Sequence, residues 1–305
     1  MSAADFTQLG FIGLGVMGEG MCRNLVAKGR WPVMASDLSP EPVSRLVELG
    51  ATAAPDAAAV AEAADVIMLC LPGGAQVEEL VLGAGGLMAA LRPGQILIDH
   101  STSPPALARR LAAEAAQRGA VALDAPIART RQAAWDGTLA IMVGAEKAAQ
   151  VERVRPVLET MGTDVVHCGG PGAGQAAKIL NNMVLFETVM ALAEARSIAV
   201  AAGFDPARMF EVMTLGSGDS FALRNHGLRA ILPDSFPDRA FSVRYAGKDL
   251  SYARALAAEC GVATPGADAL AGLFEAAAAA GDGDLYFPVI ARHLGRASRN
   301  EETEG

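Results

Sequence analysis

The first half of the chain alternates short apolar runs with segments whose apolar residues recur at helical spacing. We predict strands at residues 9–14, 32–36, 66–71, 96–99, 121–125 and 139–143. We predict amphipathic helices between them at residues 18–27, 42–49, 75–82, 104–118 and 147–161. Strands that alternate with helices indicate an α/β domain whose parallel sheet is covered on both faces.

The pattern changes near residue 170. One long helical pattern covers residues 174–202, and further helical patterns follow at 206–214, 243–260, 267–280 and 284–295, without a convincing strand. A length of 305 residues also suggests two domains. We therefore expect an α/β domain over 1–170, an all-helical domain for substrate binding and dimerisation over 171–297, and a flexible tail over 298–305.

Composition and charge exclude several classes of protein. The net charge of −9 argues against nucleic-acid binding, which needs a basic surface. The chain has no apolar run of membrane-spanning length and no export signal at its start, so we expect a soluble cytoplasmic protein that does not contact membranes. Its four cysteines and four histidines have no metal-ligand spacing, and we predict no metal site.

A glycine-rich motif predicts a dinucleotide cofactor. Gly13-Leu14-Gly15-Val16-Met17-Gly18 follows the first predicted strand and opens the first predicted helix. In such motifs the first glycine makes a tight turn, the second lets the backbone approach the pyrophosphate, and the third lets helix and strand pack closely. The N–H groups of the helix N-terminus bind the phosphates. We therefore expect a Rossmann domain at the N-terminus.

An acidic residue at the end of the second predicted strand favours NAD as the cofactor, with NADP still possible. Asp37 stands 19 residues after Gly18, where a carboxylate accepts hydrogen bonds from the adenosine ribose. The same carboxylate would repel the 2′-phosphate of NADP. The alternative is that Asp37 only stabilises a turn or caps a helix.

A lysine and an asparagine are four positions apart in the motif Gly172-Ala-Gly-Gln-Ala-Ala-Lys178-Ile-Leu-Asn181-Asn182. On a helix Lys178 and Asn182 share a face. An ammonium group on an otherwise apolar helix is costly to bury, so it needs a purpose. Beside a nicotinamide, that purpose is proton transfer to or from a hydroxyl. The alternative is a surface lysine whose stem covers apolar neighbours.

Four separated blocks resemble the β-hydroxyacid dehydrogenase family over residues 8–296. They are residues 11–18 with 24–25, residues 99–104, residues 172–182 and residues 248–250. The resemblance implies a Rossmann domain joined by a long helix to an all-α C-terminal domain. It also implies hydride transfer between C4 of the nicotinamide and C3 of a small anionic hydroxyacid or aldehyde. In that family Lys178 is the catalytic residue, Asn182 holds the substrate or orients the lysine, and homodimers or homotetramers are usual.

The resemblance assigns further site residues. It places Ser101, Asn181, Phe241 and Asp249 at the substrate, and it places Leu71, Pro72, Thr102 and Lys248 at the cofactor. Two alternatives stay open: Ser101 and Thr102 could cap the helix that is predicted from residue 104, and Phe241 could be a core residue.

One loop departs from the family pattern. Most members carry Asp-Ala-Pro-Val-Ser-Gly-Gly where this chain has Asp124-Ala-Pro-Ile-Ala128-Arg129-Thr130. A guanidinium offers five donors in a planar fork, and the Arg-Thr pair resembles the sulfolactaldehyde reductase branch. Our hypothesis is that Arg129 and Thr130 bind the anionic tail of the substrate. The alternative is that Arg129 pairs with a surface carboxylate.

The family resemblance leaves other functions to weigh. A substrate of the 3-hydroxyisobutyrate or tartronate semialdehyde type is the first alternative to sulfolactaldehyde. Imine reductases and non-catalytic dehydrogenase-like binding modules also resemble this family. Both of these lack the catalytic lysine, so the presence of Lys178 argues against them.

Overall fold

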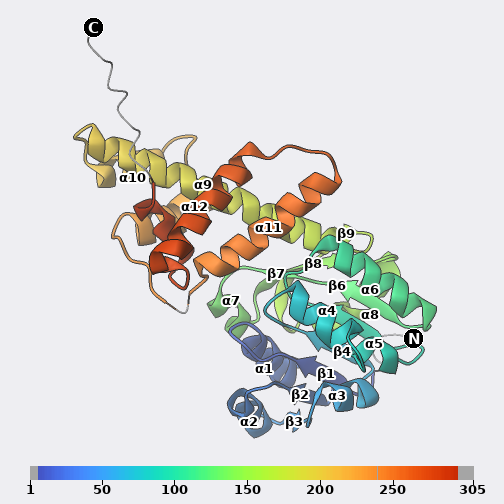
Figure 1. Cartoon of the computed structure of the whole chain (residues 1–305). Helices are drawn as coiled ribbons and strands as arrows, with labels where there is room; N and C mark the ends of the chain where they lie inside the picture. The colour runs from blue at the N-terminus through green and yellow to red at the C-terminus, as the bar shows by residue number, and fades with distance from the viewer. Residues whose placement is uncertain (1–5, 239, 295–305) are drawn as a thin grey trace. The chain divides into compact units, whose positions relative to one another are not determined.

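A computed structural model of the protein describes residues 6–238 and 240–294. Within these ranges the chain forms two compact units that divide between Ile179 and Leu180. The first unit is an α/β domain and the second is helical (Figure 1). In the described part of the chain, no helix is long and apolar enough to cross a membrane.

The first unit is built on one nine-stranded sheet with the strand order β3-β2-β1-β4-β5-β6-β8-β7, and β9 pairs with β8. Its strands are β1 (Leu9–Ile12), β2 (Val33–Ser36), β3 (Thr52–Ala53), β4 (Val66–Leu69), β5 (Ile96–Asp99), β6 (Val121–Asp124), β7 (Ile127–Ala128), β8 (Leu139–Gly144) and β9 (Gly162–Gly169). The six strands from β3 to β6 are parallel. Their order 3-2-1-4-5-6 is that of dinucleotide-binding sheets, whose ligands bind where the strand order reverses, here between β1 and β4.

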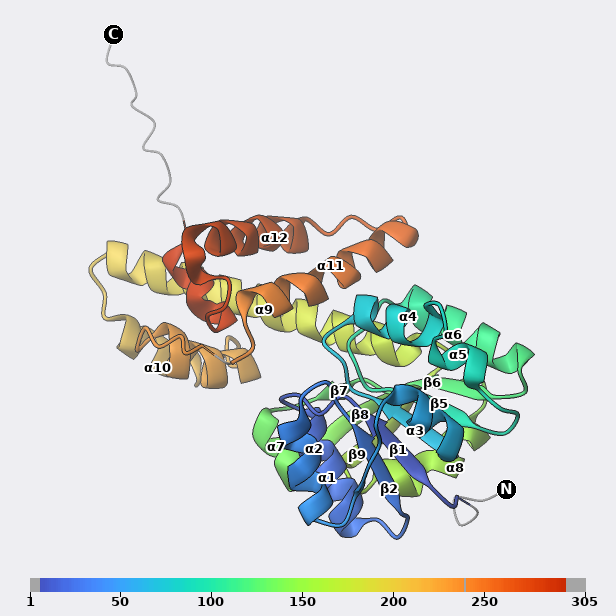
Figure 2. The same cartoon turned by 60° about the horizontal axis from the view of Figure 1, so that its bottom comes forward.

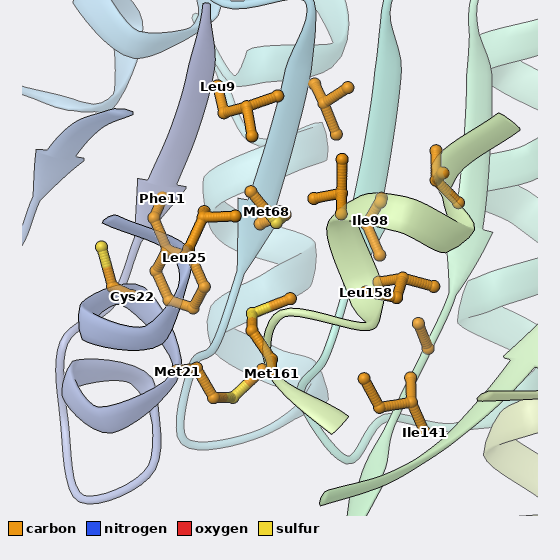
Figure 3. Close-up of a cluster of buried hydrophobic side chains, with 14 of the residues drawn as sticks. Leu9, Phe11, Met21, Cys22, Leu25, Met68, Ile98, Ile141, Leu158 and Met161 are labelled. Carbon is orange, nitrogen blue, oxygen red and sulfur yellow. The ribbon is translucent and has the colours of Figure 1, made fainter. Parts of the chain in front are cut away.

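Successive side chains along each strand point to opposite sides of this sheet, and helices bury both faces. Met68 packs on one face and Ile67 on the other. The Met68 face is covered by α1 (Gly18–Lys28), α2 (Pro40–Glu48), α7 (Arg131–Asp136) and α8 (Ala148–Leu158). The Ile67 face is covered by α3 (Ala57–Ala63), α4 (Gly74–Leu82), α5 (Leu87–Ala90) and α6 (Pro105–Gln117). Figure 3 shows Phe11 and Ile98 of the sheet packed with Leu25 of α1 and Leu158 of α8.

The second unit is helical. Helix α9 (Ala173–Ala201) runs into it from the first unit, and α10 (Pro206–Met213), α11 (Val243–Glu259) and α12 (Pro265–Ala277) follow (Figure 2). Shorter pieces are a π-helix at Leu223–Ile231, a π-helical turn at Ala278–Asp282 and a 3-10 helix at Phe287–Arg292. Helices α11 and α12 pack side by side. Phe186 of α9 lies at the centre of the core, against Phe241, Phe274 and Phe287.

The fold agrees with the predicted class and adds elements whose sequence signals are weak. Each of the six predicted strands is present, whereas β3, β7, β9, α3, α5 and α7 were not predicted. β3 and β7 have two residues each, and β9 is half exposed, so none of them forms an apolar run. The helix predicted at 284–295 is wrong at its start, where Leu285 and Tyr286 make antiparallel bridges, and the helix that follows over Phe287–Arg292 is a 3-10 helix. Residue 295 and the predicted tail at 298–305 lie outside the described residues.

Candidate active site

The candidate site of the first unit is organised by one row of residues across the parallel sheet. Ile12 of β1 pairs in register with Leu69 of β4, Leu69 with Asp99 of β5, and Asp99 with Asp124 of β6. Ser36 of β2 lies beside Ile12 in the same row. Each residue is the last of its strand, so the loops that carry the predicted cofactor residues of this unit all begin at one edge of the sheet.

The glycine-rich loop fits a dinucleotide phosphate. Gly13 has a φ of +92°, and a Cβ there would lie 2.4 Å from the carbonyl oxygen of Cys70. A Cβ on Gly18 would lie 2.0 Å from the carbonyl oxygen of Gly13. Gly15 differs, because a Cβ there would meet no protein atom within 4 Å, and Val16 beside it is exposed. The fold therefore explains Gly13 and Gly18, whereas the open backbone at Gly15 suits the approach of a ligand.

Asp37 ties the end of β2 to this loop. Its Oδ2 accepts a hydrogen bond from the backbone N–H of Leu14 at 2.5 Å, and its Oδ1 accepts one from Ser39 at 2.8 Å. The bond to Ser39 is the contact expected if Asp37 stabilises a turn, which was the alternative to binding the ribose. A carboxylate has about four lone-pair sites, so these two bonds leave capacity for ribose hydroxyls. Met17, which precedes Gly18 in the glycine-rich loop, is half-buried, and Leu38, which follows Asp37, is exposed.

The loops after β4 and β5 are joined to each other. The backbone N–H of Leu71, which precedes the exposed Pro72, donates to Ser101 Oγ at 2.9 Å. Asp99 accepts from the backbone N–H of Ser101 at 2.9 Å and from Ser103 Oγ at 2.8 Å. Burial raises the pKa of Asp99 to about 6, although these hydrogen bonds oppose the shift. Ser101 is buried in this network, and the half-buried Thr102 follows it.

The helix-capping alternative for Ser101 and Thr102 is not what the structure has, because α6 begins at Pro105 with Pro104 as its N-cap residue. Neighbouring His100 is a core residue. Its Nδ1 lies 2.8 Å from the carbonyl oxygen of Ala125, and its ring stacks on Phe11. Burial lowers the pKa of His100 to about 4, so the imidazole is neutral near pH 7.

The N-terminus of helix α9 is anchored to the end of β6. Asp124 Oδ1 accepts from the backbone N–H of Gly172 at 2.8 Å, and Oδ2 accepts from that of Gln175 at 2.8 Å. Burial raises the pKa of Asp124, and the backbone N–H donors oppose that shift. Lys178 follows Gln175 by three positions on the same helix, so its first turn is held at the sheet edge where the cofactor loops begin.

Four of the predicted polar residues belong to the second unit, namely Asn181, Asn182, Lys248 and Asp249. Asn182 is buried, donates through Nδ2 to Asp249 Oδ2 at 2.8 Å, and lies within 3.3 Å of Asn181 Nδ2 through its own Oδ1. Asp249 is 2% exposed, and its Oδ1 lies 3.1 Å from the Lys248 ammonium. The same ammonium lies over the rings of Tyr245 and Tyr252. Asn182, Asp249 and Lys248 thus form one polar chain.

Phe241 is both a core contact and a surface residue. Its ring stacks on Phe186, with the centroids 5.9 Å apart, yet the residue is 37% exposed. Tyr245 also stacks on the ring, with the centroids 6.5 Å apart, so the core interpretation accounts for its aromatic contacts and the substrate interpretation rests on its exposed part.

Arg129 makes the surface ion pair of the alternative interpretation. Its guanidinium donates to Asp164 Oδ2 at 2.5 Å, to Thr163 Oγ1 at 2.8 Å and to the carbonyl oxygen of Thr138. Thr130 caps α7, and its hydroxyl accepts from the backbone N–H of Ala133 at 3.3 Å. Arg129 also has a φ of +88°, a conformation that favours glycine. The loop therefore keeps a glycine-like backbone shape although it carries an arginine.

Three buried residues of the site were not assigned any role from the sequence. Asp99, Asp124 and Gln175 hold the strand-end loops and the first turn of α9 together. The signal was present: Asp99 is the last residue of one predicted apolar strand and Asp124 the last but one of another, where a charged residue needs a compensating partner. The partner could not be read from the sequence, because it lies on a distant segment. No group of three or more possible metal ligands occurs within residues 6–238 and 240–294.

Comparisons with known proteins agree with this geometry. Residues 8–170 match the family described as the NAD binding domain of 6-phosphogluconate dehydrogenase. Residues 172–294 match the family described as NAD-binding of NADP-dependent 3-hydroxyisobutyrate dehydrogenase. Together the two matches cover most of the chain, and they meet where the α/β unit gives way to helix α9.

Individual relatives are similar over nearly their whole length. A 3-hydroxyisobutyrate dehydrogenase of Pseudomonas aeruginosa is 41% identical over 264 residues, 85% of this chain and 88% of that protein. The 2-(hydroxymethyl)glutarate dehydrogenase of Eubacterium barkeri is 36% identical over 276 residues, 90% of this chain and 91% of that protein. The solved structure of Mycobacterium tuberculosis 3-hydroxyisobutyrate dehydrogenase with L-serine has a TM-score of 0.85 at 34% identity, and it covers 95% of this chain and 99% of its own.

Proposed function

Because the chain belongs to the 3-hydroxyisobutyrate dehydrogenase family of β-hydroxyacid dehydrogenases, which are NAD(P)-dependent oxidoreductases, we propose that it interconverts a small β-hydroxy acid and its aldehyde with NAD as cofactor. The observation that carries this proposal is the anchoring of Lys178. Its helix begins at the sheet edge where the glycine-rich loop and Asp37 also lie, and Asp124 holds its first turn there.

When bound, the nicotinamide accepts or supplies the hydride. The protein supplies the proton transfer: Lys178 Nζ takes the proton of the β-hydroxyl in the oxidation and returns it to the alkoxide oxygen in the reduction. The open backbone at Gly15 and the N-terminus of α1 suit the pyrophosphate. Asp37 suits the ribose hydroxyls and favours NAD over NADP.

For the substrate, a carboxylate is the first candidate. Relatives are named for 3-hydroxyisobutyrate and 2-(hydroxymethyl)glutarate, both carboxylates. Arg129 and Thr130 already have partners within the α/β unit, Asp164 and Ala133 respectively. The second candidate is sulfolactaldehyde, whose sulfonate would have to draw Arg129 away from Asp164. The exposed position of that ion pair favours this exchange, because exposed pairs are weak.

A substrate panel with NAD and NADP tests the proposal. It contains 3-hydroxyisobutyrate, 2-(hydroxymethyl)glutarate, L-serine, and the aldehydes sulfolactaldehyde, tartronate semialdehyde, succinic semialdehyde and methylmalonate semialdehyde. We expect Lys178→Ala to lower kcat on the best substrate by roughly 10²- to 10⁴-fold, the usual range for losing a general acid or base. Lys28→Ala is the control, because Lys28 is an exposed lysine of the same unit whose ammonium donates to the backbone carbonyl of Asp136.

Arg129→Gly separates the two substrate candidates. The variant suits the positive φ. It loses an exposed ion pair and the hydrogen bonds to Thr163 and to the carbonyl oxygen of Thr138, all at the surface, so we expect it to fold. If kcat/KM falls at least 10-fold for the sulfonate alone, sulfolactaldehyde is supported. Small and equal changes for sulfonate and carboxylates exclude a tail-binding role. No turnover of any panel member with either cofactor, or full activity of Lys178→Ala, would refute the proposed function.

A further inference from the structure

Gln175 joins the helix of Lys178 to the loop that follows β5. The side chain is fully buried, and both ends of its carboxamide bond to backbone. Oε1 accepts from the N–H of Ser103 at 2.9 Å, and Nε2 donates to the carbonyl oxygen of Ser101 at 2.7 Å. The backbone N–H of Gln175 donates to Asp124 at 2.8 Å. One residue therefore connects α9 to two neighbouring strand ends.

These bonds form a closed frame. Asp99 and Asp124 are register partners on β5 and β6. Asp99 holds Ser101 and Ser103 of one loop, and Asp124 holds the backbone of the first turn of α9. The Gln175 side chain closes the frame between that loop and that turn, so the helix is fixed both along its axis and in its rotation.

The frame lies within one helical turn of Lys178. On an α-helix, Lys178 lies about 60° around the axis and roughly 4.5 Å along it from Gln175. An apolar side chain at 175 would be cheaper to bury, so packing does not explain an amide there. The loop needs this amide because buried backbone groups require partners. That need alone is a structural role, and it becomes functional only if the frame sets where Lys178 stands.

We propose that Gln175 is a positioning residue, which holds Lys178 at its working place relative to the Ser101–Ser103 loop. This inference rests on the proposed role of Lys178 in proton transfer. Misplacing a reacting group by about 1 Å can cost roughly 100-fold in rate. We therefore expect Gln175→Met, which keeps the length and loses both side-chain hydrogen bonds, to lower the rate of hydride transfer by roughly 10- to 100-fold.

A double-mutant cycle distinguishes positioning from a structural role. The rate of NADH formation from 3-hydroxyisobutyrate and NAD is measured in the full-length protein for Gln175→Met, Lys178→Ala and the double variant. Ethylamine is added to the Lys178→Ala proteins so that a free amine restores measurable turnover. If Gln175 acts through Lys178, its substitution costs less than about 2-fold in this background, because the added amine is not attached to α9. An equal fold-loss in both backgrounds, or no loss in either, overturns the inference.

Matched variants keep the test decisive. Gln95 is a second buried glutamine of the same unit, and its Nε2 donates to the carbonyls of Ala61 and Ala64 at 2.7 Å each. Gln95→Met removes an equivalent buried amide away from Lys178, so it should lose stability while keeping its rate. If Gln175→Met does not fold, Gln175→Glu replaces it in the cycle, since it keeps the acceptor for Ser103. Full activity of Lys178→Ala without ethylamine would instead refute the proposed function, and this inference with it.

Discussion

The carboxamide of Asn182 donates a 2.8 Å hydrogen bond to the carboxylate of Asp249, and both residues are buried in the helical unit. This bond fixes the orientation of the Asn182 carboxamide, and Asp249 also forms an ion pair with Lys248. Helix α11 thus fixes the orientation of a side chain on α9 that the family resemblance assigns to the substrate.

Asp249→Ala is expected to impair both stability and turnover. It leaves the Asn182 amide and the Lys248 ammonium without this carboxylate, which costs about 1–3 kcal/mol in unfolding free energy. A similar loss in the transition state would lower kcat/KM by roughly 10- to 100-fold. Urea unfolding and steady-state kinetics measure the two effects. Asp268→Ala is the control, because Asp268 pairs with Arg254 at the surface. Unchanged kcat/KM in a destabilised Asp249→Ala protein would show that the pair is only structural.

Gly15→Ala separates cofactor binding from folding. A Cβ at Gly15 meets nothing in the protein within 4 Å, so the unfolding free energy should stay within about 0.5 kcal/mol of wild type. KM for NAD should rise at least 10-fold, because the methyl group occupies the space for the pyrophosphate. Gly18→Ala should lower the unfolding free energy more than it affects KM for NAD, since its Cβ would lie 2.0 Å from the Gly13 carbonyl oxygen. An unaltered KM for NAD in Gly15→Ala would remove this loop from the cofactor site.

Asp37→Ser is expected to shift cofactor preference. The change removes the charge that opposes a 2′-phosphate, so the ratio of kcat/KM for NAD to that for NADP should fall by roughly 10-fold or more. Stability falls as well, because the N–H groups of Leu14 and Ser39 lose an acceptor. Asp56→Ser provides the comparison: Asp56 caps α3 through the N–H of Ala59, and its loss should leave the cofactor ratio unchanged. An equal ratio in wild type and Asp37→Ser would contradict the ribose assignment.

His100 should make stability fall on acidification. Its pKa in the folded state is lowered to about 4, below the value of 6.5 for an exposed histidine, so the unfolded chain binds more protons between these values. The contribution is fully present above pH 6.5 and is lost as the pH falls towards 4. Between pH 7 and pH 5 it amounts to about 2 kcal/mol. Guanidinium unfolding of wild type and His100→Asn should show this difference in their pH dependence.

Asp99 has the opposite effect on the pH dependence of stability between pH 5 and pH 7. Its folded pKa of about 6 is raised above 3.8, so its contribution is present below pH 3.8 and is lost as the pH rises through 6. From pH 5 to pH 7 wild type should lose about 1 kcal/mol relative to Asp99→Asn. If both variants change the pH dependence of the unfolding free energy in the same direction, the pKa shifts attributed to burial of Asp99 and His100 are wrong.

The parts of this fold that are predictable from sequence are those with a local signal. The glycine-rich loop, the six main strands and the long pattern over 174–202 are visible because periodicity and glycine spacing are properties of neighbouring residues. Strands β3 and β7 are too short for a pattern, and β9 exposes much of its length. The 3-10 helix at Phe287–Arg292 reads as a continuing helix because its apolar residues keep a near-helical spacing.

The partners of the site residues are less predictable than the residues themselves. Lys178 and Asn182 stand out as a pair on one helix, yet nothing in the sequence says that Asp124 anchors the first turn or that Asp249 holds Asn182. Arg129 shows the same limit: the substitution of a family glycine is visible, whereas Asp164 lies 35 positions away and its contact depends on how β9 pairs with β8. The roles of Lys178, Asn182 and Arg129 at the substrate or cofactor remain predictions.

The row of strand ends from Ile12 to Asp124 has a consequence for how this protein can fail. Side chains alternate along a strand, so a one-residue slip of β6 against β5 would turn Asp124 to the opposite face of the sheet and shift its segment by about 3.3 Å. The anchorage of α9 would be lost although every loop residue was intact. Mutations in the strand interiors that permit misregister could therefore silence the protein without altering a single group that meets a ligand.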